Sequence, residues 1–247
     1  MKGNASGAAM KVNQNVSFMS GNAIESSAYA LLRRYSENFE PIAEPPVPVE
    51  RIADLLLELT PDWGPIEDEE DNPILAFIDP EASRIRINER HLERFAAYPG
   101  MLEFTIGHEI GHNELHILKN GIEQLELDFG DSEVHDAKSE STVLARLGVS
   151  PKGYLCRDKA SSGVKDMREK QADQFASYLL MPEYLLRPAI AHIDLLSWPS
   201  LYRLRDLFNV SITALKIRLG NLGLLYVAPD GSLHRSEVAA NGMNQLL

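Results

Sequence analysis

The stretch HEIGH at residues 108–112 decides the fold of this chain, because it is an instance of the pattern HExxH. On an α-helix, two side chains four residues apart project from the same face, about 6 Å apart along the axis. His108 and His112 can therefore reach one small cation, and Glu109 lies beside the position that stays open on the metal. Neutral imidazoles bind Zn²⁺ well, and an unligated carboxylate can accept a proton from an activated water. The stretch therefore predicts a helix that carries a catalytic zinc site.

The composition is that of an ordinary globular protein. Of the 247 residues, 44% are hydrophobic, which is enough to bury a core. The net charge of −12 argues against a protein whose function is to bind nucleic acid non-specifically, because such binding normally needs a basic surface. Cys156 is the only cysteine, as expected in a reducing cytoplasm. Residues 1–23 lack the apolar core of a signal peptide, and no apolar run is long enough to span a membrane, so we predict a cytoplasmic protein.

The hydrophobic pattern predicts a mostly helical α+β fold with a small sheet. Two short runs, at 74–78 and 84–88, are separated by a turn-forming segment and are expected to form a β-hairpin. Alternating arginines and isoleucines in the second run indicate one buried and one wet face. We expect helices over about 24–37, 49–59, 99–119 and 165–181, and two short helices within 201–225 around Asn209-Val210-Ser211.

A catalytic zinc normally has three protein ligands, so a third residue must join the two histidines. Glu169 is the best candidate, because Glu169 and Asp173 are four residues apart on a predicted helix and can face the same neighbour. One carboxylate can bind the metal while the other accepts a hydrogen bond from a ligand histidine. The alternative is that both are solvated charges on an amphipathic helix. His116 lies too far along a straight helix to reach the same ion, so a capping or surface role is expected.

Taken together, these segments resemble the ImmA/IrrE-type zinc metallopeptidases. HEIGH is followed at 169–182 by a segment of the form ExxADxFAxxLLMP, and the stretches 46–53, 85–88 and 204–224 are also similar. The resemblance covers about Ala28 to Leu225. It implies a zincin-like, gluzincin-type fold, in which the edge strand of a small mixed sheet lies beside the cleft and the HExxH helix packs beneath it. A helix-turn-helix-like region is implied at the C-terminal end.

The resemblance implies a zinc-dependent endopeptidase with one Zn²⁺. Its ligands would be His108, His112 and Glu169, its general base Glu109, and Asp173 would orient a ligand histidine. Members of the family are commonly encoded near repressor-type regulators and cleave them, which relieves transcriptional repression in mobile elements or stress responses. The expected partner is therefore a protein substrate of the repressor type. Relatives usually carry the third ligand closer to HExxH than Glu169 lies here.

The expected organisation has four parts along the chain. These are a disordered lead at 1–23, a metallopeptidase domain at 24–194 with an insertion at 120–164, a helix-turn-helix-like region at 195–230 that packs on the core, and a tail at 231–247.

Two further residues are candidates at the site. Tyr178, one turn beyond Asp173, can donate to an oxyanion, although a core aromatic ahead of LLMP is the alternative. Cys156 is expected on the loop that enters the third-ligand helix, where a thiolate could take the fourth zinc position and keep the enzyme latent. The alternative is a buried or incidental thiol. We expect the scissile peptide to pair with the strand at 84–88.

The competing interpretation is a regulatory protein that binds DNA or a partner and has a metal site with little or no proteolysis. Lys216 and Arg218 are the only basic residues of the expected recognition helix. Because phosphate contacts supply most of the affinity for DNA, the net charge of −12 argues against direct binding. Two imidazoles and one carboxylate suit zinc, with Mn²⁺ as the alternative.

Overall fold

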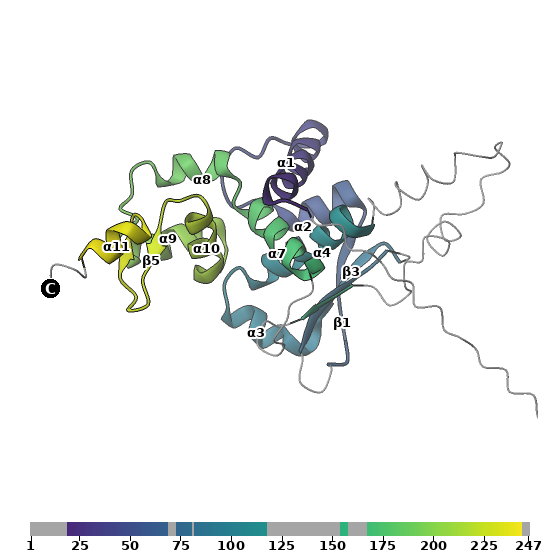
Figure 1. The fold of residues 1–247 in the computed structure, drawn as a ribbon. Coiled ribbons are helices and arrows are strands. Elements are labelled where there is room, and N and C mark those ends of the chain that lie inside the picture. The colour runs from purple at the N-terminus through teal and green to yellow at the C-terminus, as the bar shows by residue number, and fades with distance from the viewer. Residues whose placement is uncertain (1–18, 69–72, 81, 118–153, 158–166, 244–247) are drawn as a thin grey trace, which may run out of the picture.

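A computed structural model describes residues 19–68, 73–80, 82–117, 154–157 and 167–243, and the structural statements below concern these residues. The sheet and the longest helices form one end of the molecule, and the C-terminal helices gather at the other end (Figure 1). The fold is α+β, as expected. The expected disordered lead lies outside the described residues for its first 18 positions, and so does the insertion at 120–164 apart from 154–157.

The sheet is four-stranded and mixed, with the order β1-β3-β2-β4. Its strands are β1 (Thr60–Gly64), β2 (Ile74–Asp79), β3 (Arg84–Asn88) and β4 (Tyr154–Arg157). β2 and β3 pair antiparallel, with Ala76 opposite Ile87 and Ile78 opposite Ile85, so the predicted hairpin is confirmed. Ile85 and Ile87 are buried while Arg84 and Arg86, which alternate with them, are partly exposed, as the pattern indicates.

The position of β3 in the sheet corrects one expectation. β3 pairs with β1 on one side, in parallel, and with β2 on the other. The backbone of β3 is therefore hydrogen-bonded to neighbouring strands on both sides, and the expectation that a substrate peptide pairs with residues 84–88 is wrong. In the described part of the chain β4 is the edge strand beyond β2, and it contacts the helix that carries HEIGH.

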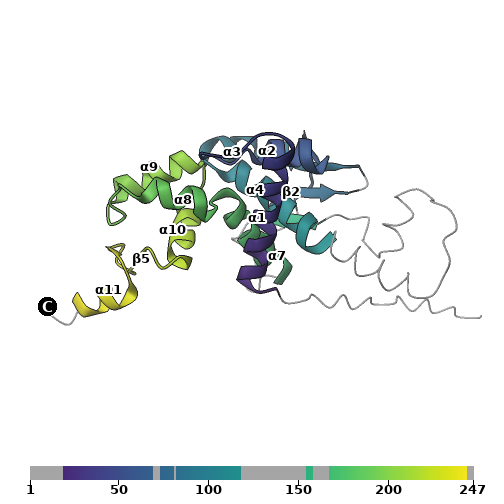
Figure 2. The same ribbon diagram turned by 90° about the horizontal axis from the view of Figure 1, so that it is seen from above.

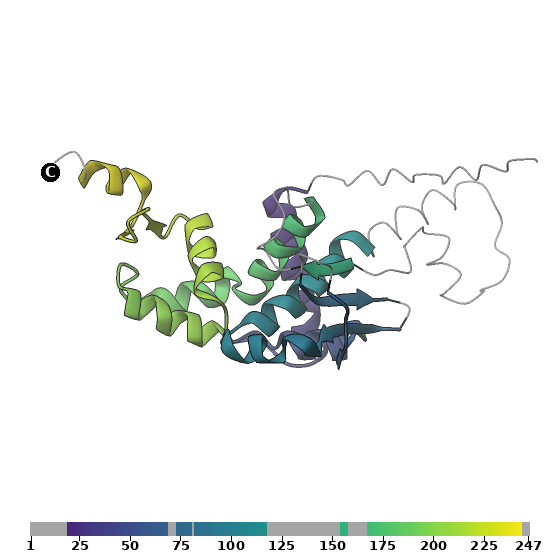
Figure 3. The same ribbon diagram turned by 90° about the horizontal axis from the view of Figure 1, so that it is seen from below.

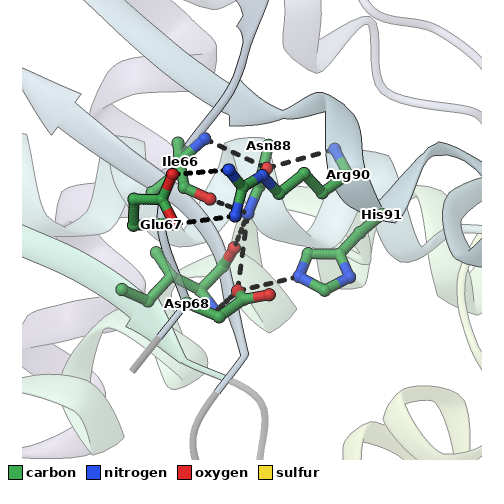
Figure 4. A network of polar contacts seen from close by, with 7 residues as sticks. Ile66, Glu67, Asp68, Asn88, Arg90 and His91 are labelled. Carbon is green, nitrogen blue, oxygen red and sulfur yellow. Dashed lines mark hydrogen bonds and ion pairs between the residues drawn. The ribbon is translucent and has the colours of Figure 1, made fainter. Parts of the chain in front are cut away.

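Buried hydrogen bonds to Asn88 hold the connection between β1 and β2 (Figure 4). The Asn88 amide donates to the carbonyls of Ile74 at 2.8 Å and Ile66 at 3.1 Å, and its oxygen accepts from the Ile66 amide at 3.2 Å. Asp68 accepts from the Ile74 amide at 2.8 Å, and its Oδ1 lies 3.0 Å from His91 Nε2. His91 is thereby satisfied by a structural contact that fixes this end of the sheet.

Three helices pack on one another beside the sheet: α1 (Gly21–Asn38), α4 (Met101–His112) and α7 (Met167–Leu180). α7 contacts both α1 and α4, and α4 contacts β2, so α4 lies between α7 and the sheet (Figure 2). Ser20 caps α1 by accepting a hydrogen bond from the Ala23 amide. The helix buries Ile24, Ala28, Leu31, Leu32 and Tyr35. This spacing of three and four residues is the reason that one face of α1 joins the core.

Shorter helices complete this core. They are α2 (Val49–Arg51) with the π-helical turn η1 (Ile52–Leu56), the 3₁₀ turn η2 (Glu89–His91), α3 (Leu92–Ala97), the π-helical turn η3 (Asn113–Ile117) and α8 (Glu183–Ile190). η3 follows α4 directly, so the HEIGH helix continues to Ile117 in a wider winding. None of the helices in the described ranges has the length and hydrophobicity that crossing a lipid bilayer requires.

The C-terminal region begins with α9 (Trp198–Phe208) and α10 (Ile212–Asn221), the two short helices expected around Asn209-Val210-Ser211. Asn209 adopts the left-handed conformation with φ of 48°, which ends α9, and Ser211 caps α10. A small hairpin of β5 (Tyr226–Val227) and β6 (Leu233–His234) and the helix α11 (Glu237–Met243) follow. Figure 3 shows this yellow C-terminal segment at the end of the molecule away from the sheet. The expected tail therefore contains regular structure.

Arg218 fixes α10 to the rest of the molecule. Its side chain is 1% exposed and donates to the Met181 carbonyl at 3.0 Å and to Glu25 at 2.7 Å. Its guanidinium also lies over the ring of Tyr178, 4.6 Å from the centroid. One of the two basic residues of the predicted recognition helix is therefore buried in an ion pair that joins α10 to α1.

Candidate metal centre

Small residues bring α4 and α7 close enough for their side chains to share one site. A Cβ added to Gly111 would lie 3.1 Å from the Cα of Ala172, and one added to Gly107 would lie 3.4 Å from the Cβ of Ala176. Ala172 and Ala176 are four residues apart, so they lie on one face of α7. Because neither surface has a bulky side chain, the backbones approach closely and the long side chains beside this seam converge.

His108, His112 and Glu169 offer ligand atoms that all lie within 4.8 Å of one another. The two Nε2 atoms are 3.0 Å apart, and oxygens of Glu169 lie 3.4 Å from His108 Nε2 and 3.3 Å from His112 Nε2. Ligands bound tetrahedrally to zinc at about 2.0–2.1 Å are about 3.3 Å apart. The three side chains therefore have the identity and the spacing that a tetrahedral zinc site requires, and they can hold a metal ion.

The second nitrogen of His108 is held by Asp173. His108 Nδ1 donates to Asp173 Oδ1 at 2.9 Å, which leaves Nε2 directed at the other two ligands. Burial by itself lowers the pKa of His108, but hydrogen bonds to Asp173 and Glu169 and the nearby charge of Glu109 raise it to about 9. Glu169 and Asp173 thus act on the same histidine from one helix face, the first beside the candidate ligand nitrogen and the second behind the ring.

The protonation states of the other two ligands suit a cation. Burial holds the pKa of His112 below its ordinary value, which favours the neutral imidazole that metals bind. Burial would raise the pKa of Glu169, but its contacts with His108 and His112 lower it well below the ordinary range. Glu169 therefore remains a carboxylate at neutral pH.

Glu109 occupies the position expected of a general base. It follows His108 on α4, is fully buried, and its charge is close enough to raise the pKa of His108. A carboxylate in these surroundings is shielded from bulk water, so its interaction with a nearby cation or proton is strong.

Three further candidates are His116, Tyr178 and Cys156. His116 was expected to have a capping or surface role; it is buried, so the surface role is wrong, and its Nε2 lies 3.4 Å from the carbonyl oxygen of Arg168. The Tyr178 hydroxyl lies 3.2 Å from the position that a Cβ on Gly21 would take, so this residue packs between α1, α7 and α10. Cys156 lies on β4 opposite Ala76, and the expectation of a loop at this position is wrong.

The sequence analysis missed the glycines and alanines of the α4–α7 seam. Their signal was present in the sequence, because Gly107 and Gly111 are four residues apart and so are Ala172 and Ala176. Matching small residues at this spacing on two helices indicate a close backbone approach.

Part of the chain is similar to a known peptidase family. Residues 151–220 match the model of peptidase family M78, described as the IrrE N-terminal-like domain. No curated protein matches the chain. A solved structure of a Mycobacterium tuberculosis transcriptional regulator is similar over 81% of this chain and 48% of its own length, with 14% sequence identity and a TM-score of 0.43. The chain thus spans about half the length of that protein. The family match, which includes Glu169, Asp173 and the LLMP segment, confirms the resemblance of this chain to the ImmA/IrrE-type zinc metallopeptidases.

Proposed function

We propose that this protein is a zinc-dependent endopeptidase of the cytoplasm and that its substrate is a repressor-type transcriptional regulator. The observation that carries the proposal is the convergence of His108, His112 and Glu169, with donor atoms 3.0–3.4 Å apart. Structural zinc sites usually have four protein ligands, whereas catalytic sites have three and an open position. Three candidate ligands among the described residues, beside the buried carboxylate of Glu109, therefore favour catalysis over a purely structural site.

Each residue of the site has a separate role in the proposed peptide hydrolysis. When bound, zinc polarises the scissile carbonyl and makes water acidic enough to lose a proton near neutral pH. Glu109 accepts that proton from the attacking water and then donates it to the nitrogen of the leaving amine. Asp173 holds His108 in the tautomer that presents Nε2 to the metal, so it acts by positioning a ligand.

The substrate backbone is proposed to bind along β4. In the described ranges β2 is the only strand that pairs with β4, and β4 contacts α4, which carries Glu109. An extended peptide that adds to such an edge forms backbone hydrogen bonds whatever its sequence, and its carbonyl can then be held near the metal ligands. β4 thus takes the role that the sequence analysis gave to residues 84–88, which form the interior strand β3.

Support for a repressor-type substrate comes from the family resemblance. The alternative, a DNA-binding regulator, has little positive charge available. Arg218 is buried against Glu25, and Arg205 pairs with its neighbour Asp206 at 2.5 Å. Phosphate contacts need cations that reach the surface.

The test is cleavage of a purified repressor-type regulator encoded beside this chain, with zinc content measured on the same samples. Glu109→Gln is expected to retain one zinc per chain and to slow cleavage by roughly 10²- to 10⁴-fold, since it removes the general base. His112→Ala is expected to lose both zinc and cleavage. Glu93→Gln, which changes an exposed glutamate of α3, is the control and should leave both unchanged.

Three outcomes would contradict the proposal. Full cleavage by Glu109→Gln would remove this residue from the mechanism. A wild-type protein that holds zinc but cleaves no regulator would favour a partner-binding module, and a shift of duplex DNA at physiological salt would favour the DNA-binding alternative.

A further inference from the structure

A cavity of about 630 Å³ lies beside the candidate metal centre, between α4, α7 and α10. Much of its surface is apolar and comes from different elements, with Phe104 from α4 and Ala214 and Ile217 from α10. Its volume lies within the roughly 300–1,000 Å³ range of pockets that bind ligands. It is also larger than any single side chain, so an occupant can enter with part of a peptide backbone.

One residue of the cavity wall contacts a candidate metal ligand. Asp173 lines the cavity and accepts the hydrogen bond from His108 Nδ1 at 2.9 Å. Thr105, which also lines it, lies one helical turn before His108, and Lys170 follows Glu169 directly. The three candidate ligands themselves do not line the cavity. The cavity is therefore separated from the candidate ligand His108 by a single side chain, that of Asp173.

The mouth of the cavity exposes apolar surface. Tyr98 and Ile217 both line it, and they are 60% and 51% exposed. Large apolar groups around a concave surface mark binding sites, because an occupant that covers them removes them from water.

We propose that this cavity receives a bulky apolar side chain of the protein substrate, next to the bond that is cleaved, and that α10 sets its size through Ala214 and Ile217. The inference rests on the proposed function, because it assigns the substrate preference of the same site. It gives α10 a role in selecting substrates. Ala214 is small and 9% exposed, so a larger residue there fills the cavity, and Ile217 forms its outer wall.

The experiment measures binding of two hydroxamates to the zinc-loaded full chain by calorimetry. Acetohydroxamate binds the metal alone, and 2-benzyl-substituted propanohydroxamate adds one aromatic side chain. The benzyl compound is expected to bind roughly 10- to 100-fold more tightly, as full burial of one large apolar side chain predicts. Ala214→Leu is expected to reduce this ratio to roughly threefold or less while the affinity for acetohydroxamate stays unchanged.

A matched pair of variants guards against a folding defect in Ala214→Leu. Ile217→Ala removes an exposed apolar side chain from the cavity wall, and Leu207→Ala removes one of similar exposure, 46%, from α9. Ile217→Ala is expected to lower the benzyl preference about threefold, and Leu207→Ala to leave it unchanged. Equal affinity of both hydroxamates for the wild type, or equal effects of these two alanine variants, would overturn the proposal. Failure of both hydroxamates to bind would instead refute the metal site and with it the proposed function.

Discussion

Replacement of Arg218 by Met tests whether α10 belongs to the same core as α1 and α7. Met keeps an unbranched side chain of similar length but loses the hydrogen bonds to Met181 and Glu25 and the stacking on Tyr178. A charge-assisted hydrogen bond contributes about 1.5–3 kcal/mol, a neutral one about 1 kcal/mol, and a cation–π contact about 0.5–2 kcal/mol. Glu25 keeps 26% of its side chain exposed, so water solvates its charge once the partner is gone. The expected loss of unfolding free energy is therefore about 3 kcal/mol, at the lower end of the cost of breaking a buried pair.

The assay is urea unfolding followed by circular dichroism, with the slope of the transition checked for equality between variants. Glu25→Gln and the double variant complete a cycle that isolates the coupling between the two charges, expected at about 1–2 kcal/mol. Arg203→Met on α9 is the control. Arg203 is exposed and its guanidinium donates to the Ser200 hydroxyl at 3.3 Å, so the expected loss is below about 0.5 kcal/mol. A loss below about 1 kcal/mol for Arg218→Met would refute the reasoning, because Arg218 would then not be what fixes α10 to α1.

Three further predictions concern the metal centre. Asp173→Ala is expected to weaken zinc binding by about 10- to 100-fold in competition with a chelator, because His108 loses the contact that orients it; unchanged affinity would show that Asp173 does not position it. Since the pKa of His108 is raised to about 9 without metal, zinc binding at pH 7 should release a proton from it, measured by calorimetry in buffers of different ionisation enthalpy. The same raised pKa makes the stability of the metal-free protein depend on pH. The stabilisation that protonated His108 provides is complete below about pH 6.5 and is lost as the pH rises through about 9. A metal-free protein that gains stability from this group over that window would contradict the prediction. Gly111→Ala should cost about 1–3 kcal/mol and weaken zinc binding, because the new Cβ meets the Ala172 backbone at 3.1 Å; a variant as stable as the wild type would mean that the helices separate freely.

The sequence predicted those parts of the fold whose signal is local. The HEIGH helix, the hairpin of β2 and β3 and the pair Glu169 and Asp173 each follow from spacing within one short segment. The edge of the sheet did not follow from such spacing. β1 reads TPDWG, and Pro, Asp and Gly are all depleted in strands, so nothing local indicated that it pairs with β3. β3 consequently looked like an edge strand when it lies in the interior.

Long-range ion pairs escaped prediction for a related reason. Glu25 and Arg218 are 193 positions apart, and neither residue type at its position indicates a buried partner. In the sequence, the position of Arg218 on its helix is equally compatible with a surface cation that contacts phosphate. Charged residues are also mostly exposed, which favours that interpretation. Only the packing of α10 on α1 and α7 distinguishes the two situations, and that packing depends on residues from all three helices.

The contacts on the two faces of α10 show why its helix-turn-helix-like sequence pattern alone does not predict its role. An amphipathic helix after a tight turn has one apolar face whether it reads DNA or packs on an enzyme. In this chain Arg218 turns one face toward α1, while Ala214 and Ile217 line the cavity that reaches Asp173 and, through it, His108. A helix held in this way cannot lie in a DNA groove with its cavity-lining face without leaving the core. The contacts of Arg218 and Ala214 therefore hold α10 in the core and place it beside the candidate metal ligands, which the helix-turn-helix-like pattern alone does not indicate.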